Sequence, residues 1–462
     1  MKDQTQRGNA GHRVCSSTLN QRGVDRVRSC ESLIPEDVDL LELMLSRENM
    51  MAAWKRVKAN DGTSGVDGLS VADATVMIRE KWDSIKRQIE RGTYRPLPVR
   101  RTYIPKGNGE TRPLGIPTVL DRLIQQALSQ ILVQIFDPGF SESSYGFRPN
   151  RSAQDAVRFI ASKIKLGKKW AIDIDLSQFF DRVNHDLLME RVSRKVKDKR
   201  VLRLIGRYLR AGVSEDGRVR STSLGVPQGG PLSPLLANIM LDDFDKELEH
   251  RGHVFARYAD DFVILVSSKA AALRVKEGLR RYLERKLKLV VNVQKSRAVP
   301  ATQSEFLGFT FARNKIRWTE KTIRQFKYMV KRLTKRNWGV SLKTRIESLN
   351  RYLRGWINYF RLSEYYSNVE KVDDWIRRRL RACVWKQWRK TKTKIRELRK
   401  LGVSKSEAIS TACSNKSYWR LSKTLATHSG MTNAWFESLG LVNVRQEWIS
   451  FHYPNQRSRV TL

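Results

Sequence analysis

Apolar and polar residues follow a helical period in two segments of the N-terminal third of the chain. Apolar positions recur at that period through residues 40–57, and residues 121–136 carry one apolar stripe that Asp137-Pro138-Gly139 ends. Residues 103–117 instead read as a strand, a Gly-rich turn and a second strand. We therefore predict two helices and a hairpin, preceded by a polar segment, residues 1–35, that shows no periodicity.

Short runs of β-branched and aromatic residues alternate with helical segments in the middle of the chain. Residues 170–175 form one such run, and residues 255–266 form two runs around a tight Ala259-Asp260-Asp261 step. This step predicts a hairpin with adjacent carboxylates at its tip. A second hairpin is predicted over residues 213–224, followed by a helix whose apolar stripe runs to residue 248. The mixture of hairpins and helices predicts an α+β fold.

Beyond residue 317 the apolar pattern is purely helical. Three helices are predicted, over residues 323–333, 342–360 and 369–390, with apolar seams and basic outer faces. Such a bundle can lie along a nucleic-acid duplex. From residue 390 onward basic residues alternate with aromatic ones, a pattern that fits either stacking on single-stranded nucleic acid or the core of a small domain.

The net charge of the chain indicates more about its partner than its length does. Its 462 residues include 88 Lys and Arg against 47 Asp and Glu, a formal net charge of +41. An excess of this size indicates a polyanionic partner, although a general basic binding protein has the same composition. The four cysteines lack metal-ligand spacing, and no apolar run approaches the roughly 18 residues of a membrane span. We therefore expect a cytoplasmic protein that works where its nucleic acid is.

Three carboxylates on neighbouring predicted strands are candidates for a metal-binding catalytic site. Asp260 and Asp261 lie at the hairpin tip, and Asp175 ends the run that begins at Trp170. Adjacent acids resist joint ionisation unless a cation lies between them. A lone Asp-Asp pair also fits a solvated acidic turn. With a third acid present, the set is suited to Mg²⁺, and two such ions can hold the attacking and leaving oxygens of a phosphoryl displacement.

The motif Tyr258-Ala-Asp-Asp261 after a hydrophobic strand resembles the catalytic box of reverse transcriptases. The surrounding blocks, in order from about residue 40 to beyond residue 388, resemble the group II intron-encoded reverse transcriptase/maturases of bacteria and organelles. Gly355-Trp-Ile-Asn-Tyr-Phe-Arg361 resembles the thumb/maturase block of that family and favours it over other bacterial reverse transcriptases.

The resemblance implies a right-hand polymerase fold. Fingers and palm with an antiparallel sheet are expected first, then an α-helical thumb/maturase bundle and a small basic helical C-terminal region. The implied divisions are a flexible segment (residues 1–35), an N-terminal extension (36–95), the fingers and palm (96–315), the thumb/maturase domain (316–390) and a DNA-binding-like region (391–462).

The resemblance also implies roles for residues around the incoming nucleotide. Lys106, Arg112 and Gln228 are expected to contact it, and Phe180 is expected to lie under its sugar and exclude a 2′-hydroxyl. Without the flanking motif, Phe180 reads as an ordinary core residue. Lys295 is either near the triphosphate and metal region or a solvated lysine.

Several arginines are candidate contacts to nucleic acid. Arg148 and Arg151 either grip template phosphate or belong to a basic loop. On the third predicted thumb helix, Arg377, Arg378 and Arg381 belong to the basic face that is expected to lie along a duplex.

These observations predict an RNA-directed DNA polymerase that uses two Mg²⁺ ions at Asp175, Asp260 and Asp261. The expected partners are group II intron RNA, an RNA template with a DNA primer, target DNA and deoxynucleoside triphosphates, with no membrane. Two alternatives are an RNA-binding splicing cofactor only, and a reverse transcriptase of a defence or diversity-generating class. Because the sequence reaches Leu462 without the Cys and His pairs of a metal-dependent nuclease, we expect no second-strand cleavage.

Overall fold

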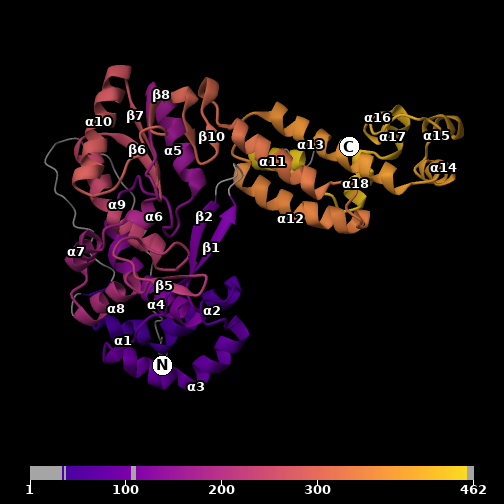
Figure 1. Ribbon diagram of the computed structural model, residues 1–462. Helices are drawn as coiled ribbons and strands as arrows, with labels where there is room; N and C mark the ends of the chain where they lie inside the picture. Colours follow the sequence, from indigo (N-terminus) through magenta and orange to yellow (C-terminus); the bar gives the residue numbers. More distant parts are fainter. Residues whose placement is uncertain (1–33, 36–37, 106–110, 455–462) are drawn as a thin grey trace, which may run out of the picture.

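The computed structural model describes residues 34–35, 38–105 and 111–454. Figure 1 shows a body, which we define as the described residues up to 318, and an arm formed by residues 320–454 that extends from one side of it. The expectations for residues 1–33 and for Lys106 lie outside the described residues. The architecture is α+β in the body and helical in the arm, which confirms the predicted fold class.

The N-terminal part of the body is helical. Its helices are α1 (Leu40–Leu45), α2 (Arg47–Asn60), α3 (Val71–Glu90) and α4 (Val119–Phe136). The single helix predicted over residues 40–57 is wrong, because Ser46 has a non-helical ψ of 146° and its side chain caps α2 by accepting from the Asn49 amide. The apolar positions in the sequence keep one helical period across the break, so the periodicity does not reveal it, and Met51 in that pattern is exposed.

A four-stranded sheet follows the N-terminal helices. Its strands are β1 (Val99–Pro105), β2 (Thr111–Ile116), β4 (Val213–Glu215) and β5 (Arg218–Arg220), in the order β2-β1-β4-β5. The antiparallel pairing of β1 with β2 confirms the first predicted hairpin, and that of β4 with β5 confirms the second.

The central sheet consists of β3 (Trp170–Ile174), β6 (Val254–Tyr258), β7 (Asp261–Val266) and β8 (Arg297–Pro300), in the order β6-β7-β3-β8 and antiparallel throughout. Side chains alternate between its two faces, as the strand period requires. Ile172 and Ile264 pack in a core with α9 (Ser233–His250) and α10 (Lys269–Arg285). Ala171 and Val263 pack in a second core with α5 (Ala153–Lys165).

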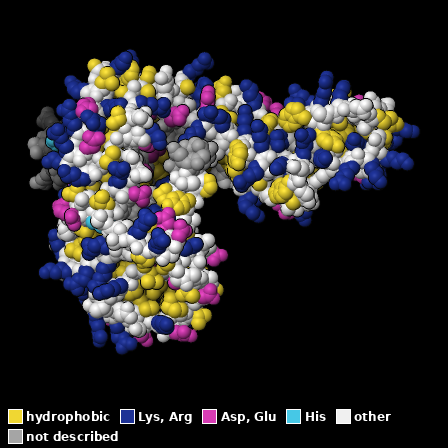
Figure 2. Space-filling model, viewed as in Figure 1, with side chains coloured by type: hydrophobic (Ala, Val, Ile, Leu, Met, Phe, Trp, Pro, Cys, Tyr) yellow, Lys and Arg dark blue, Asp and Glu magenta, His cyan; other side chains and the backbone are white. Residues whose placement is uncertain are grey.

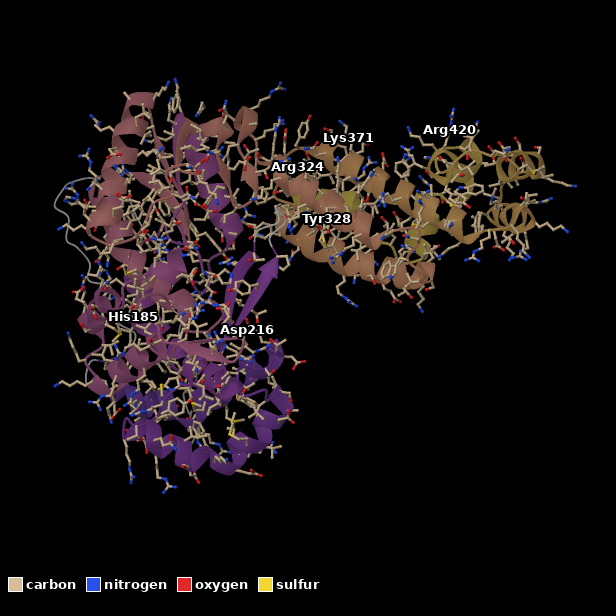
Figure 3. All side chains as sticks on the ribbon, in the orientation of Figure 1. His185, Asp216, Arg324, Tyr328, Lys371 and Arg420 are labelled. Carbon is tan, nitrogen blue, oxygen red and sulfur yellow. The ribbon has the colours of Figure 1, made fainter. Side chains whose placement is uncertain are left out.

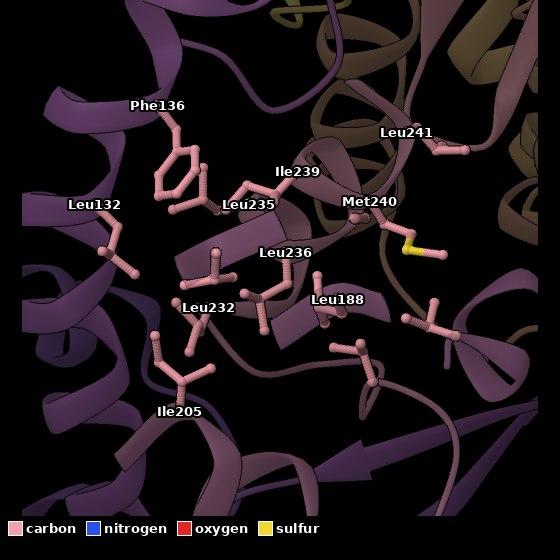
Figure 4. Close-up of a cluster of buried hydrophobic side chains, with 14 of the residues drawn as sticks. Leu132, Phe136, Leu188, Ile205, Leu232, Leu235, Leu236, Ile239, Met240 and Leu241 are labelled. Atoms are coloured by element: carbon pink, nitrogen blue, oxygen red, sulfur yellow. The ribbon is translucent and has the colours of Figure 1, made fainter. Parts of the chain in front are cut away.

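Helix α9 joins the central sheet to the N-terminal helices. Its predicted apolar stripe is buried, and the helix begins at Ser233. Figure 4 shows this stripe meeting side chains from α4, α7 (His185–Lys195) and α8 (Lys199–Leu209). The labelled residues are Leu132, Phe136, Leu188, Ile205, Leu232, Leu235, Leu236, Ile239, Met240 and Leu241. The shorter α6 (Phe179–Arg182) lies between β3 and α7 in the chain.

A small sheet joins the body to the arm. Its strands are β9 (Glu305–Phe306), β10 (Phe309–Thr310) and β11 (Arg317–Trp318), in the order β11-β10-β9. The arm then consists of α11 (Glu320–Leu333), α12 (Leu342–Phe360), α13 (Tyr366–Gln387), α14 (Thr391–Lys400), α15 (Lys405–Ala412), α16 (Tyr418–Leu421), α17 (Leu425–Gly430), α18 (Asn433–Ser438) and α19 (Val444–His452).

The arm shares one hydrophobic core with α5 and the small sheet. Phe436 and Trp448 are fully buried in it, so these two C-terminal aromatics pack in the core and do not offer a stacking surface. None of the helices in the described part of the chain is long and apolar enough to cross a bilayer.

Candidate active site

The structure brings the three predicted carboxylates to one edge of the central sheet. Ala259 and Asp260 form the turn between β6 and β7, and Asp261 begins β7. Asp175 directly follows β3, the strand that pairs with β7. In that pairing Ile174 lies opposite Phe262, so the chain around Asp175 continues beside Asp261. The hairpin predicted from the sequence is therefore confirmed, and it places residues far apart in the chain on neighbouring strands.

The buried side chain of Arg257 supports the backbone of this turn. Ala259 adopts a left-handed conformation (φ 58°), which costs a residue with a Cβ about 1 kcal/mol. Arg257 Nη1 donates to the Ala259 carbonyl at 3.0 Å and to Asn238 Oδ1 at 2.9 Å. Its Nε donates to both carboxylate oxygens of Asp245, at 2.8 and 2.9 Å. The side chains of Arg257 and Asp245 are both fully buried, so this ion pair fixes the turn from inside the core.

Gly146 packs directly against the same turn. A Cβ at this position would overlap the amide nitrogen of Ala259 and lie 2.9 Å from the Tyr258 carbonyl carbon. Asn238 Nδ2 donates to the Gly146 carbonyl at 2.8 Å, and the Tyr145 amide donates to the Arg257 carbonyl at 2.9 Å. A side chain at position 146 would therefore push on backbone that has no room to yield.

We predict that Gly146→Ala displaces the Asp260 turn. Overpacking is expected to lower the free energy of unfolding by about 1–3 kcal/mol. Primer extension is expected to fall by about 100-fold, because small displacements of reacting groups have effects of this order. The matched control is Gly355→Ala at an exposed position of α12, where an added Cβ meets nothing within 4 Å. Equal activity of the two variants in a primer-extension assay would show that Gly146 has no bearing on the turn.

Loss of hydration raises the pKa of the hairpin carboxylates. Part of the Asp261 side chain reaches solvent, yet the surrounding protein raises its pKa to about 7, with Asp260, Asp173 and Asp175 adding to the shift. Burial also raises the pKa of Asp260, and the positive charge of Arg112 opposes that shift. Carboxylates that resist ionisation together are suited to sharing a cation.

Asp173 is a neighbouring carboxylate that our reading of the sequence missed. It lies two residues before Asp175, and its backbone pairs with Val263. Its carboxylate accepts from Ser304 Oγ at 2.7 Å and from Arg297 Nε at 3.2 Å. The spacing of two residues along a strand was the available signal, since it places side chains on one face of a sheet.

The carboxylates do not form a closed ligand cage. Among the described residues, no group of three or more His, Cys, Asp or Glu side chains is placed to hold a metal ion. The assignment of Asp175, Asp260 and Asp261 as metal ligands therefore stays a prediction. The pairing of Ile174 with Phe262 keeps Asp175 beside the hairpin, and its negative charge adds to the raised pKa of Asp260 and of Asp261.

A cavity of about 740 Å³ gathers three of the residues assigned to the nucleotide. Arg112, Phe180 and Gln228 all line it, together with Phe147 and Arg122. Arg112 Nε donates to Gln228 Oε1 at 2.8 Å, which ties β2 to the loop before α9. That loop is also held by backbone bonds, from the Val226 amide to the Phe180 carbonyl and from the Gly115 amide to the Gln228 carbonyl.

His185 has a structural position below this loop. It is buried, and its Nε2 lies 2.7 Å from the Gly225 carbonyl. His185 is also the first residue of α7, so its contact joins the start of that helix to the loop. Lys295, by contrast, is exposed, and its triphosphate role remains a prediction.

Three of the predicted nucleic-acid contacts are wrong because their guanidinium groups are buried. Arg148 bonds to Asp137 and to the Ser141 and Ser144 carbonyls. Arg377 pairs with Asp373 one turn earlier in α13, and Arg381 donates to the Met431 carbonyl. A buried charge needs such internal partners, so these arginines connect parts of the protein to one another.

The two remaining arginines are half-buried. Arg151 donates to the Glu142 carbonyl, and the Arg378 guanidinium lies 3.9 Å from the centre of the Trp419 ring. Their contacts to nucleic acid remain predictions.

Exposed cations on the arm were missed because burial cannot be read from a run of arginines. Lys and Arg side chains project along the edges and the tip of the arm, with hydrophobic and other side chains between them (Figure 2). Figure 3 labels Arg324 and Tyr328 on α11, Lys371 on α13 and Arg420 on α16. All four are exposed, and Tyr328 is 64% exposed. An exposed aromatic ring among cations suits contact with nucleic acid.

Comparison with known proteins identifies the class of the chain. Residues 104–311 match the family model described as reverse transcriptase (RNA-dependent DNA polymerase). Residues 323–402 match the group II intron, maturase-specific domain. Protein YkfC of Escherichia coli is 35% identical over 323 residues, which cover 61% of this chain and 84% of that protein. The group II intron-encoded protein LtrA of Lactococcus lactis is 32% identical over 336 residues, which cover 58% of this chain and 56% of that protein.

Solved structures show weaker likeness. A partial Cas6-RT-Cas1–Cas2 complex has a TM-score of 0.35 at 25% identity, covering 54% of this chain and 43% of that chain. Apo telomerase from Candida tropicalis has a TM-score of 0.38 at 16% identity, covering 52% of this chain and 60% of that chain. Neither score is high enough to carry an argument.

Residues 104–311 of the body, which include the three acids at one edge of its central sheet, match a reverse transcriptase domain, a class that typically uses divalent metal ions. With the maturase-specific match in the arm and the relatives above, the chain belongs to the group II intron reverse transcriptase/maturase family. Both domains imply nucleic-acid substrates.

Proposed function

We propose that this chain extends a DNA primer on an RNA template, with two Mg²⁺ ions held by Asp175, Asp260 and Asp261. The observation that carries the proposal is the placement of these acids at one sheet edge, electrostatically coupled to Arg112 of the nucleotide cavity. The raised pKa of Asp261 supports it, because clustered and partly dehydrated carboxylates favour a bound cation. Mg²⁺ prefers such oxygen ligands.

Different residues of the chain would have different roles in the reaction. Arg112 and Gln228, joined by a hydrogen bond across the cavity, would bind the triphosphate and orient its α-phosphate toward the primer. Phe180, which is buried and lines the cavity, would lie under the sugar. Bound divalent ions supply Lewis-acid stabilisation of the attacking 3′-hydroxyl and of the pyrophosphate leaving group. Lys106 and Lys295 are further proposed contacts to the nucleotide.

Phe180→Val tests the nucleotide assignment. Removal of the ring is expected to raise the use of ribonucleoside triphosphates relative to deoxynucleoside triphosphates by at least about tenfold, since the steric bar to a 2′-hydroxyl is lost. The measurement is kcat/KM for each nucleotide on one RNA template. Phe159→Val on α5 controls for the loss of a half-buried ring elsewhere. An unchanged ratio in a variant that still extends primers would remove Phe180 from the nucleotide site.

We further propose that the chain binds group II intron RNA to assist splicing and target-DNA insertion. The maturase-specific match and the exposed cations of the arm support this role. A variant without the carboxylates that still promotes splicing of the flanking intron would separate this role from polymerisation. Loss of both activities in that variant, with RNA binding intact, would mean that they depend on one site.

The bacterial origin of YkfC and LtrA supports action in the bacterial cytoplasm. We retain the domain division at residues 95, 315 and 390 as part of this proposal.

A further inference from the structure

A two-residue turn in the small sheet lies between the arm and Asp261. Leu307 and Gly308 connect β9 to β10, and both have positive φ, 51° and 82°. The left-handed conformation is unfavourable for leucine, so the surrounding contacts must hold it. β9 packs against β7, the strand that Asp261 begins, and the Leu307 amide acts to lower the pKa of the Asp261 carboxyl. The turn is therefore a direct neighbour of the catalytic hairpin.

Side chains of the arm, and the amide of Thr319 just before it, donate hydrogen bonds to the carbonyl groups of this turn. Tyr359 Oη, on α12, donates to the Leu307 carbonyl at 3.2 Å. The Thr319 amide and Thr322 Oγ1 donate to the Gly308 carbonyl at 3.1 and 2.9 Å. Phe360 closes the remaining space, since a Cβ on Gly308 would lie 3.1 Å from its ring.

The ring of Tyr359 is held independently of its hydroxyl group. It stacks on Phe309 with centroids 6.0 Å apart and meets Phe360 edge-on at 4.7 Å. Burial raises the pKa of Tyr359 to about 12, so the hydroxyl remains protonated and able to donate at neutral pH. Removing only the hydroxyl would leave the packing in place and release the Leu307 carbonyl.

We propose that Tyr359 is a positioning residue that couples the arm to the catalytic carboxylate Asp261 through the Leu307 peptide. The hydroxyl fixes the orientation of that peptide, and the peptide amide orients the carboxylate. A shift of α12 when the arm grips a duplex would then be transmitted to the acid. This inference rests on the proposed polymerase function.

Tyr359→Phe is the test, with primer extension on an RNA template as the assay. Loss of one hydrogen bond that acts on the reacting geometry is expected to lower kcat about five- to tenfold, with KM for the nucleotide changed less than about twofold. The Mg²⁺ concentration for half-maximal activity is expected to rise as well, because Asp261 is less well oriented. A role confined to packing would move neither kcat nor the Mg²⁺ requirement selectively.

Tyr352→Phe is the matched control on the same helix. Tyr352 is half-buried against Phe326, and its hydroxyl makes no hydrogen bond with any other described residue. It is expected to behave as the unmodified chain. Equal kcat and Mg²⁺ dependence in the two variants would overturn the coupling, as would a lowered melting temperature in Tyr359→Phe that accounts for its lost activity. Absence of extension by the unmodified chain would instead reject the proposed function itself.

Discussion

Asp260→Asn is expected to lower primer extension on an RNA template by at least about 1,000-fold, while binding of RNA stays within a few fold. The substitution keeps the shape of the side chain and removes its negative charge. A carboxylate that holds catalytic cations contributes several kcal/mol of transition-state stabilisation, and each 1.36 kcal/mol is tenfold in rate. Binding of RNA depends on the cations distributed over the chain and not on this acid.

Asp216→Asn is the matched control for this result. Asp216 lies at the exposed turn between β4 and β5 with φ 49°, a conformation that asparagine tolerates, and Figure 3 shows it on the body away from the arm. We expect full activity from this variant. Extension by Asp260→Asn at the level of Asp216→Asn would remove the carboxylates from the reaction. A parallel loss of RNA binding would indicate a general folding defect.

Arg257→Met is expected to have the largest effect on stability. It leaves the Asp245 carboxylate buried without its cation, and the removal of one partner from a buried pair costs about 3–5 kcal/mol. It also releases the Ala259 carbonyl and so the backbone of the turn that carries Asp260. The measurement is the free energy of unfolding from denaturant titration, together with primer extension at a temperature where the variant is folded.

The comparison for Arg257→Met is Arg281→Met on α10. Arg281 is exposed and pairs with Glu277 one turn earlier. Exposed pairs of this kind contribute little, so we expect stability close to that of the unmodified chain. If the two variants unfolded at the same denaturant concentration, the ion pair beneath the turn would not be the support that we assign to it.

The hairpin of Asp260 and Asp261 could be predicted from the sequence because its signals are local. Apolar runs on both sides require strands, and two polar residues between them require a tight turn. The third acid, Asp175, could be added for the same reason, since it ends an apolar run. Its position beside β7 depends on the order of strands in the sheet, which local patterns do not contain.

Burial of charge accounts for most of what the sequence did not reveal. Arg378 and Arg377 are neighbours in α13, yet one guanidinium lies over Trp419 and the other is buried with Asp373. Arg257 stands in a strand next to the motif and gives no sign that Asp245, twelve residues earlier, neutralises it in the core. These pairings are fixed by tertiary packing, because a buried charge is stable only where distant residues supply its partners.

The break at Ser46 and the Leu307 turn show a second limit. Ser46 interrupts a continuous apolar pattern through a cap, and the pattern itself does not change. Leu307 adopts a backbone conformation that its side chain disfavours, so propensity argues against the observed turn. Both features follow from what surrounds them.

The central claim is that Asp175, Asp260 and Asp261 gather around divalent ions when substrate is bound. The direct measurement is anomalous diffraction from crystals of the chain with an RNA template, a DNA primer, an unreactive deoxynucleotide analogue and Mn²⁺ in place of Mg²⁺. Our account predicts two anomalous peaks among these three carboxylates, with Arg112 and Gln228 on the nucleotide phosphates. An ordered nucleotide with no ion at these carboxylates would contradict it.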